Sequence, residues 1–238
     1  MNEVRIKLIK KEEVAEGTMA FHFEKPEGFE FQAGQFADFT LINPPEADAE
    51  GNRRAFSFVH SSDEGDLMFT TRMRDSAFKR VLKNLSVGAE LKMDGPYGSY
   101  VLHKTESTPA VFLIGGIGIT PVRSIISDAT YRKLPHKITL FYSNKTPEDT
   151  AFLEDFNRFA KENSNLTFVP VMTRSTEEEW QGERGHINAE MIKKYVPDVH
   201  TPIYYISGPK AMVATMREIL TDLKVNEDNI RTEQFSGY

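Results

Sequence analysis

The feature of this chain that most restricts its fold is a change of pattern near residue 105. Before it, short alternating or β-branched runs are separated by glycine, proline and asparagine at close spacing, which is typical of antiparallel strands. After it, apolar runs alternate with segments of helical period, which is typical of a parallel sheet covered by helices. A polar stretch over residues 103–109 separates the two patterns. We therefore expect two domains, residues 1–105 and residues 106–238.

The first domain is expected to be a small antiparallel β-barrel, because several short strands accompany a single helix. That helix carries four apolar side chains on one face, and the segment 43–52 reads as a solvated loop. The expected strands are 4–10, 18–24, 35–41, 55–60, 67–73 and 90–94, and the expected helix is 76–85.

The second domain is expected to be an α/β domain with a doubly wound parallel sheet. Its apolar runs are short enough to be buried strands, and the segments between them have the period of helices. The expected strands are 110–114, 137–142, 166–172 and 203–207, and the expected helices are 121–132, 150–163, 188–195 and 209–223.

Composition excludes several classes of protein. With 39% hydrophobic and 27% charged residues, the chain is not disordered, collagen-like or a coiled coil. No apolar run approaches the roughly 18 to 20 residues that a membrane span needs, and the start of the chain does not resemble a signal peptide, so we expect a cytoplasmic protein. A net charge of −6 argues against nucleic-acid binding.

The chain has no cysteine, which excludes disulfides, a Cys-ligated zinc site, a Cys-held iron–sulfur cluster and a thiol nucleophile. Its six histidines are scattered, without the spacing of metal ligands or the order of a catalytic triad. We therefore assign no metal site and no histidine to catalysis. Any role in electron transfer requires another cofactor.

Two turns of the second domain have the composition of nucleotide-binding turns. In residues 111–121 a buried strand leads through glycines into a helix, with Thr120 as the expected N-cap and Pro121 as the first helical residue. Residues 205–212 repeat this design with Ser-Gly-Pro. Glycines and a helix N-terminus suit a phosphate, and ligands bind outside the carboxyl ends of parallel strands, so both turns should face one crevice. A purely structural βα connection is the alternative for each turn.

The first domain adds Arg-x-Phe-Ser at residues 54–57 and Gly-Pro-Tyr-Gly at residues 95–98. Together with Gly-Gly-Ile-Gly-Ile-Thr-Pro at 115–121 and Ser-Gly-Pro at 207–209, these motifs, in this order and spacing, resemble those of the ferredoxin-NADP reductase family of flavoenzymes. The resemblance covers essentially the whole chain, and the ordered set is more specific than any single motif. It implies that the first domain binds FAD and that the second binds NAD(P)H.

The resemblance assigns FAD contacts mainly to the first domain. Arg54 would pair with the pyrophosphate, Phe56 would pack on one face of the isoalloxazine, and Ser57 would bond near flavin N5. Residues 74–79 match the family's phosphate cradle at a helix start, with serine and lysine where the family has glycine and serine. The implied FAD residues are Arg54, Ala55, Phe56, Ser57, Arg74, Ser76, Ala77, Phe78, Thr120 and Phe235.

The second domain would hold the dinucleotide beside the flavin. Ser207 stands where many relatives place a cysteine near nicotinamide C4, and Glu233 would lie near the active centre. Phe235, or else Tyr238, would cover the second flavin face. The resemblance thus implies that Ser57, Ser207 and Glu233 are catalytic. The implied NAD(P) residues are Gly116, Gly118, Thr120, Pro121, Arg174, Gly208 and Pro209.

The choice between NADPH and NADH depends on two loops. The strand expected to end at Tyr142 leads into residues 143–145 without the carboxylate that would indicate NAD. Residues 173–174 resemble the Ser-Arg pair that contacts the 2′-phosphate in NADP-using relatives. We therefore favour NADPH over NADH, although a lone arginine on a loop is also typical of a solvated charge.

The resemblance implies hydride transfer from nicotinamide C4 to flavin N5, followed by release of single electrons. Without cysteine, the plant-type ferredoxin domain fused to some relatives is missing. The acceptor would be a separate ferredoxin, flavodoxin, oxygenase component or small molecule. A free-flavin reductase remains an alternative, as does a flavin-binding electron-transfer or regulatory subunit without NAD(P)H activity of its own.

A cluster of basic residues lies where the flavin phosphates are expected. Five positive charges within twelve residues are opposed in that segment only by Asp75. Such a positive face would suit an acidic redox protein, whose association it would accelerate. A helix whose charges serve only solubility and the bound phosphates is the alternative. The basic residues are Arg72, Arg74, Lys79, Arg80 and Lys83.

Overall fold

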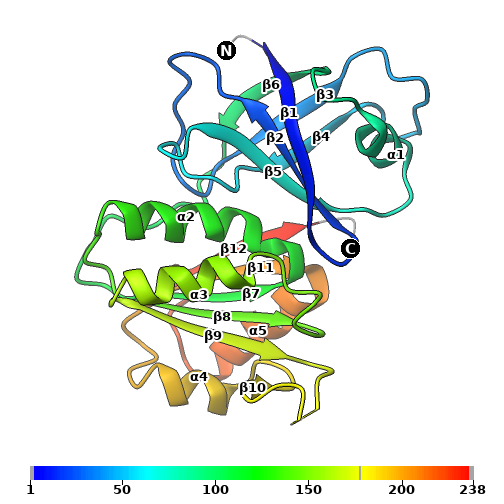
Figure 1. Ribbon diagram of the computed structural model, residues 1–238. Coiled ribbons are helices and arrows are strands. Elements are labelled where there is room, and N and C mark those ends of the chain that lie inside the picture. The colour runs from blue at the N-terminus through cyan, green and yellow to red at the C-terminus, as the bar shows by residue number, and fades with distance from the viewer. Residues whose placement is uncertain (1–2, 177, 236–238) are drawn as a thin grey trace.

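The computed structural model describes residues 3–176 and 178–235, with the backbone alone at residue 235. An antiparallel sheet forms the upper region in Figure 1, and a parallel sheet with helices on both faces forms the lower one. This is the fold class that the sequence predicts. No helix in the described part of the chain is long and apolar enough to cross a membrane.

The antiparallel sheet has the strand order β4-β3-β6-β1-β2-β5. Just beyond β4, the N–H of Val59 donates to the carbonyl oxygen of Met68 in β5 (2.8 Å), which links the two edges of the sheet. The sheet therefore curls into a barrel. Its elements are β1 (Val4–Ala15), β2 (Thr18–Glu24), β3 (Phe36–Leu41), β4 (Arg53–Ser57), β5 (Asp66–Arg72), α1 (Ala77–Asn84) and β6 (Glu90–Tyr97).

Alternation along β2 determines what the barrel encloses. Phe21 and Phe23 point into a core that also contains Phe39 and Phe69, whereas the intervening His22 belongs to the opposite face. Each fully buried phenylalanine contributes roughly 1.5 to 3 kcal/mol relative to an exposed one. The opposite face of β2 and β5 is therefore left to pack against the rest of the molecule.

The lower region is a parallel sheet in the order β10-β9-β8-β7-β11-β12. Two of its strands, β10 and β12, were not predicted as strands from the sequence. Its elements are β7 (Ala110–Gly115), η1 (Gly116–Gly118), α2 (Ile119–Tyr131), β8 (Ile138–Asn144), α3 (Leu153–Glu162), β9 (Leu166–Met172), β10 (Glu183–Arg184), α4 (Ala189–Tyr195), β11 (Ile203–Pro209), α5 (Lys210–Asp222), η2 (Glu227–Asn229) and β12 (Ile230–Phe235).

Strand β7 shows why this sheet is doubly wound. Phe112 and Ile114 pack into the core under α2 and α3, whereas Val111 and Leu113 pack into the core under α4 and α5. A strand buried on both faces reads as a continuous apolar run, which is the pattern at residues 110–114. Figure 1 shows α2 between the sheet and the barrel, with α4 and α5 on the far side.

Helix α2 joins the two regions through polar contacts. Arg123, only 5% exposed, donates to the carbonyl oxygen of Val59 (3.2 Å), to Glu64 (3.1 Å) and to Asp155 (2.7 Å). Burial opposes ionisation of Glu64, but the charge of Arg123, together with hydrogen bonds from the Ser61 N–H and the Ser127 hydroxyl, lowers the pKa of that carboxyl. Because buried charges need partners, this network favours one relative placement of the barrel and the parallel sheet.

Candidate functional site

A cavity of about 610 Å³ opens at the carboxyl ends of β7, β8, β9 and β11. Gly116, Asn144 and Pro209 line it from the parallel sheet, and Arg72 of β5 lines it from the barrel. Open α/β sheets bind ligands at this end of their strands. We call this cavity the sheet-end crevice.

The two glycine-containing turns pack directly against each other beside the crevice. The Ser207 hydroxyl donates to the carbonyl oxygen of Gly118 (2.9 Å). A Cβ added to Gly118 would lie 2.6 Å from the Ser207 carbonyl carbon and 2.7 Å from the Gly208 nitrogen. Gly208 itself has φ +151°, and a Cβ there would lie 3.0 Å from the Gly115 oxygen. Glycine is therefore required for this close backbone packing. Both turns contribute residues to the lining of the crevice, as the sequence predicts.

The expected helix start at this turn is wrong. Residues 116–118 form the 3-10 turn η1, so α2 begins at Ile119 with Gly118 as its N-cap. Thr120 lies within the first helical turn, where its hydroxyl donates to the Ile117 carbonyl oxygen (3.1 Å). Pro121 is tolerated there because the first helical turn needs no N–H donor.

Of the expected dinucleotide residues, Gly116 and Pro209 line the crevice. Thr120 and Pro121 are buried within α2 and are not among the lining residues. Arg174 follows the lining residue Thr173, and its backbone N–H donates to the Lys145 carbonyl oxygen (2.9 Å). This bond places the loops after β8 and β9 side by side.

Two buried donors in the crevice have no acceptor among the described residues: Arg72 Nε and Asn144 Nδ2. Buried donors without partners are rare in native proteins and indicate a missing ligand or water. Lys145 also lines the crevice, as does Asp149, which forms an ion pair with Arg72 (3.7 Å). The crevice therefore fits a polar, anionic molecule such as a dinucleotide. The contribution of Arg72 could not be found from sequence, since it comes from the barrel.

At the same strand ends, Glu233 of β12 pairs in register with Ser207 of β11. Its Oε2 has no hydrogen-bond partner in the described part of the chain, and burial raises the pKa of Glu233 to about 7. Tyr100 is also buried, and burial, together with the charge of Glu233, raises the pKa of its phenol. The structure thus brings Ser207 and Glu233 together and adds Tyr100, which the sequence analysis did not single out.

The barrel has its own anion-binding corner, formed by Arg54 and the start of α1. Asp48 occupies it: one carboxylate oxygen accepts from Arg54 (3.2 Å) and the other from the Ala77 N–H (3.1 Å). Burial opposes ionisation of Asp48, but N–H donors from Glu50 and Ala77 and the guanidinium of Arg54 lower its pKa. A helix N-terminus and an arginine are the donors that a phosphate prefers. We call this place the barrel corner.

The other expected flavin residues surround this corner. Arg54 lies over the ring of Phe78 (5.2 Å), and half-buried Phe56 stacks on Phe69, with ring centroids 4.3 Å apart. Ser76 is used as the N-cap of α1 and accepts from the Lys79 N–H (3.3 Å). The positions of the remaining expected residues are mixed: Ala77 and Ser57 are buried, Ala55 and Arg74 are exposed, and the Phe235 side chain and Tyr238 lie outside the described residues.

The structure corrects the expected positive face on α1 at Arg80, whereas Lys83 is exposed as expected. Arg80 forms ion pairs with Glu46 and Asp75, so its charge is locally neutralised, and the two carboxylates raise its pKa. Lys79 points inward and donates to the Arg72 carbonyl oxygen (2.8 Å). The loop 43–52 brings Glu46 to α1, a long-range contact that the local charge count could not include.

Comparisons with known proteins agree with this geometry. Residues 112–218 match the family of oxidoreductase NAD-binding domains. The chain is 27% identical to a subunit of the Na(+)-translocating NADH-quinone reductase of Pseudoalteromonas atlantica, over 90% of this chain and 56% of that protein. It is 26% identical to the reductase component of propane 2-monooxygenase of Rhodococcus jostii, over 90% of this chain and 58% of that protein. The chain thus spans little more than half the length of these curated relatives.

A solved structure shows the same fold over the whole chain. The ferredoxin NADP+ reductase from Neisseria gonorrhoeae, with bound FAD and NADP, superimposes with a TM-score of 0.80 at 21% identity, over 98% of this chain and 99% of that one. The sheet-end crevice and the barrel corner lie in the two halves of this fold. Residues 112–218 thus have the sequence of an oxidoreductase NAD-binding domain, and the chain as a whole has the two-region fold of the Neisseria ferredoxin NADP+ reductase.

Proposed function

We propose that this chain takes a hydride from NAD(P)H onto bound FAD and passes the electrons to a separate acceptor, such as a ferredoxin, a flavodoxin or an oxygenase component. The observation that carries the proposal is the sheet-end crevice, which is lined by both regions and contains buried donors without acceptors among the described residues. When bound, FAD accepts two electrons as a hydride and releases them singly.

The barrel corner would hold the FAD pyrophosphate. Arg54 and the N–H groups at the start of α1 already bind a carboxylate there, so the corner suits an anion. Phe56 and Phe78 would provide apolar surface beside it, and Ser57, buried at the end of β4, would orient the flavin. Binding at this corner requires Asp48 to give up its contacts with Arg54 and Ala77.

On the dinucleotide side, Gly116 and Pro209 would approach the diphosphate, and Gly118 and Gly208 would keep the two turns packed. Ser207 fixes this packing through its bond to Gly118, which would hold the nicotinamide at a constant position. Glu233 Oε2 would carry a proton below about pH 7 and lose it above that pH, so its charge beside the site changes near neutrality.

The coenzyme is proposed to be NADPH. Lys145 and Arg174 lie on adjacent loops at the crevice, and residues 143–145 at the end of β8 include no carboxylate. Further along the same loop, Asp149 lines the crevice, where it lies beside Arg72 (3.7 Å). Two cations on these loops suit a 2′-phosphate. The names of similar proteins include both coenzymes, NADH for the quinone reductase and NADP for the Neisseria structure.

Replacement of Arg174 by alanine tests this choice. We expect KM for NADPH to rise about threefold to tenfold, with KM for NADH little changed, because only NADPH carries the 2′-phosphate. Steady-state kinetics with both coenzymes measure this. Equal changes for the two coenzymes would contradict a role in 2′-phosphate recognition.

Anaerobic mixing of the purified, flavin-loaded protein with NADPH, and separately with NADH, tests the proposed function. Bleaching of the flavin absorbance is expected with at least one coenzyme. If neither reduces the flavin, the chain is a flavin-binding subunit without coenzyme activity. Gel filtration separates the remaining alternative: a yellow protein supports bound FAD, whereas a colourless but active protein supports a free-flavin reductase.

A further inference from the structure

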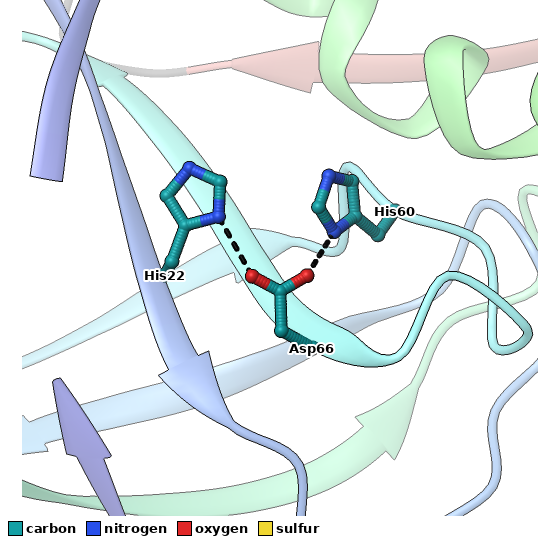
Figure 2. Close-up of side chains that lie close together, drawn as sticks. All are labelled: His22, His60 and Asp66. Atoms are coloured by element: carbon teal, nitrogen blue, oxygen red, sulfur yellow. Dashed lines mark hydrogen bonds and ion pairs between the residues drawn. The ribbon is translucent and has the colours of Figure 1, made fainter. Parts of the chain in front are cut away.

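A second polar cluster lies on the outer face of the barrel, and none of its residues lines the sheet-end crevice. His22 on β2, Asp66 at the start of β5 and His60 beyond β4 come together, and Glu12 of β1 adjoins them. Figure 2 shows the Asp66 carboxylate between the two imidazole rings, with one oxygen directed at each ring. We call these four residues the His–Asp cluster.

Strand pairing explains how residues so far apart in the sequence meet. His22 lies opposite Met68 in the pairing of β2 with β5, and Asp66 lies two residues from Met68 on the same face, opposite Glu24. Glu12 pairs with Ala20, one alternation from His22 on the same face. Ala20, Val59 and Met68 form an apolar floor under this face. The cluster is therefore held by regular strand geometry.

The contacts in the cluster exceed what neutral imidazoles can donate. His22 Nδ1 lies 2.8 Å from Asp66 Oδ2, and His22 Nε2 lies 3.0 Å from Glu12 Oε1. A neutral imidazole has one donor and one acceptor, whereas an ionised carboxylate only accepts. One of the two contacts therefore needs either a second ring proton, which makes the imidazole cationic, or a cation between nitrogen and oxygen. The surroundings supply one at Lys10, but it bonds the other oxygen of Glu12 (2.8 Å).

The donor set resembles that of a transition-metal site. Two imidazoles and two carboxylates carry a total charge of −2, which a divalent cation balances. Nitrogen donors suit zinc and neighbouring first-row metals, whereas Ca²⁺ and Mg²⁺ prefer oxygen ligands throughout. On this basis we propose that the His–Asp cluster binds a divalent transition-metal ion of the zinc class.

The distances in the cluster permit such an ion after small side-chain movements. Ligand atoms of His22, His60 and Asp66 all lie within 4.8 Å of one another. In a tetrahedral zinc site, with metal–ligand bonds of about 2.0 to 2.2 Å, ligand atoms are roughly 3.3 to 3.5 Å apart. Asp66 Oδ1 already lies 2.5 Å from His60 Nδ1. The rings must therefore separate slightly from Asp66 and approach each other.

An ion can reach the cluster from the seam between the two regions. A cavity of about 460 Å³ is lined by Glu12, His22 and His60 on the barrel side, and by Phe152 and Asp155 on the side of the parallel sheet. The side chains of His22 and His60 are only 9% and 15% exposed, so they are largely shielded from bulk water. A metal here would bind at the seam where Arg123 also joins the two regions.

Zinc titration of the untagged, flavin-loaded protein tests the proposal; a polyhistidine tag must be absent because it binds zinc itself. After dialysis against EDTA and removal of the chelator, competition with a chromophoric zinc indicator gives stoichiometry and affinity. We expect one tight equivalent of Zn²⁺, an affinity lowered about tenfold or more in His60→Gln and in Asp66→Asn, and no competition by Mg²⁺. His200→Gln, which changes an exposed histidine outside the cluster, serves as the matched control.

Two further measurements keep the test independent of folding. Co²⁺ in place of Zn²⁺ should give visible absorption bands of a nitrogen-ligated site in the wild type and in His200→Gln, and not in His60→Gln. Zn²⁺ should raise Tm in the first two proteins only. Retained flavin content would show that His60→Gln is folded. Zinc binding that is absent from the wild type, or equal in all variants, would overturn the proposal.

Discussion

The sheet-end crevice and the barrel corner are both suited to anions, yet they differ in whether their hydrogen-bond donors already have acceptors within the protein. In the crevice, Arg72 Nε and Asn144 Nδ2 are buried without acceptors among the described residues, and the carboxylate that Arg72 meets, Asp149, lies 3.7 Å away. In the barrel corner, Arg54 and the Ala77 N–H are bonded to Asp48. The crevice can therefore receive a ligand as it stands, whereas the corner must first exchange a carboxylate of its own for a phosphate.

The difference follows from the elements that build each place. The crevice is formed by strand ends whose backbones interlock at Gly118 and Ser207, so its shape is fixed by the sheet. The corner is closed by the loop 43–52, which is held by local hydrogen bonds and ion pairs with Arg54 and Arg80. Exposed ion pairs contribute little stability each, so this loop can move at modest cost.

The largest effect should come from breaking the interlocked turns. Gly118→Ala would place a Cβ 2.6 Å from the Ser207 carbonyl carbon, where backbone atoms cannot give way easily. We expect a loss of about 3 kcal/mol in the free energy of unfolding and coenzyme oxidation slowed more than tenfold. Chemical denaturation and stopped-flow flavin reduction measure the two effects.

Gly28→Ala is the matched control for Gly118→Ala. Gly28 has φ +72° and open space around its Cβ position, so it tests backbone strain without a clash. It should cost about 1 to 2 kcal/mol and leave flavin reduction unchanged. If Gly118→Ala behaves like Gly28→Ala, the crevice is less rigid than its interlocked backbones suggest, and its contrast with the barrel corner weakens.

The next effect concerns the charge buried beside the crevice. Burial raises the pKa of Glu233 to about 7 from an ordinary value of 4.5, so the folded protein holds this proton more tightly than the unfolded chain. The tightly held proton stabilises the folded protein by its full amount below pH 4.5. This stabilisation is lost as the pH rises through 7 and does not change at higher pH. A shift of this size corresponds to about 3 kcal/mol across the window.

Glu233→Gln should remove that pH dependence. Between pH 4.5 and 8, the free energy of unfolding obtained from denaturation curves should decrease with pH in the wild type. In the variant, most of that decrease should be absent. Glu106→Gln, an exposed carboxyl remote in sequence, should retain the wild-type slope. An unchanged slope in Glu233→Gln would mean that solvent reaches this carboxyl after all.

How far the sequence predicts this molecule depends on the range of the contacts involved. Hydrophobic period placed β2 and β9 with the observed bounds and located both glycine turns. Strand β12 was not predicted, because it is an edge strand of mixed polarity without a hydrophobic period. The N-cap was misplaced at Thr120 because glycines can extend a helix backwards as a 3-10 turn.

The site was harder to predict, since its decisive contacts join distant segments. Local motifs predicted Arg54 and Ser207 as candidates, and they stay predictions. No local pattern predicts three placements: Asp48 against Ala77, Arg72 in the crevice, and His22 beside Asp66. Each of them depends on strand order or loop closure. Sequence periodicity reports the face on which a residue lies, and only tertiary pairing determines its partner.

In the barrel corner, Arg54→Ala should weaken FAD retention by about tenfold to a hundredfold, because a charge-assisted bond to phosphate is worth roughly 1.5 to 3 kcal/mol. Fluorescence titration of the flavin-free protein with FAD measures this. Arg53→Ala is the matched control, since Arg53 is exposed and pairs with Asp38 and Asp94 instead. Equal FAD affinities in the two variants would contradict a role of Arg54 in binding FAD.

The smallest expected effect has the opposite sign and tests the difference between the crevice and the corner most directly. If the Asp48 carboxylate competes with phosphate for Arg54 and the Ala77 N–H, Asp48→Asn should strengthen FAD binding about threefold to tenfold. Asparagine keeps the size and one acceptor of aspartate but loses its charge, so the loop can still close while competing less. The gain should shrink at high salt, because the charge involved is partly exposed.

Glu50→Gln is the control: Glu50 also pairs with Arg54 (2.9 Å), but its side chain is 78% exposed, and such a pair contributes little. A loss of affinity in Asp48→Asn would instead mean that Asp48 holds the loop in a position the bound nucleotide needs, and the barrel corner would then be as ready for its ligand as the crevice.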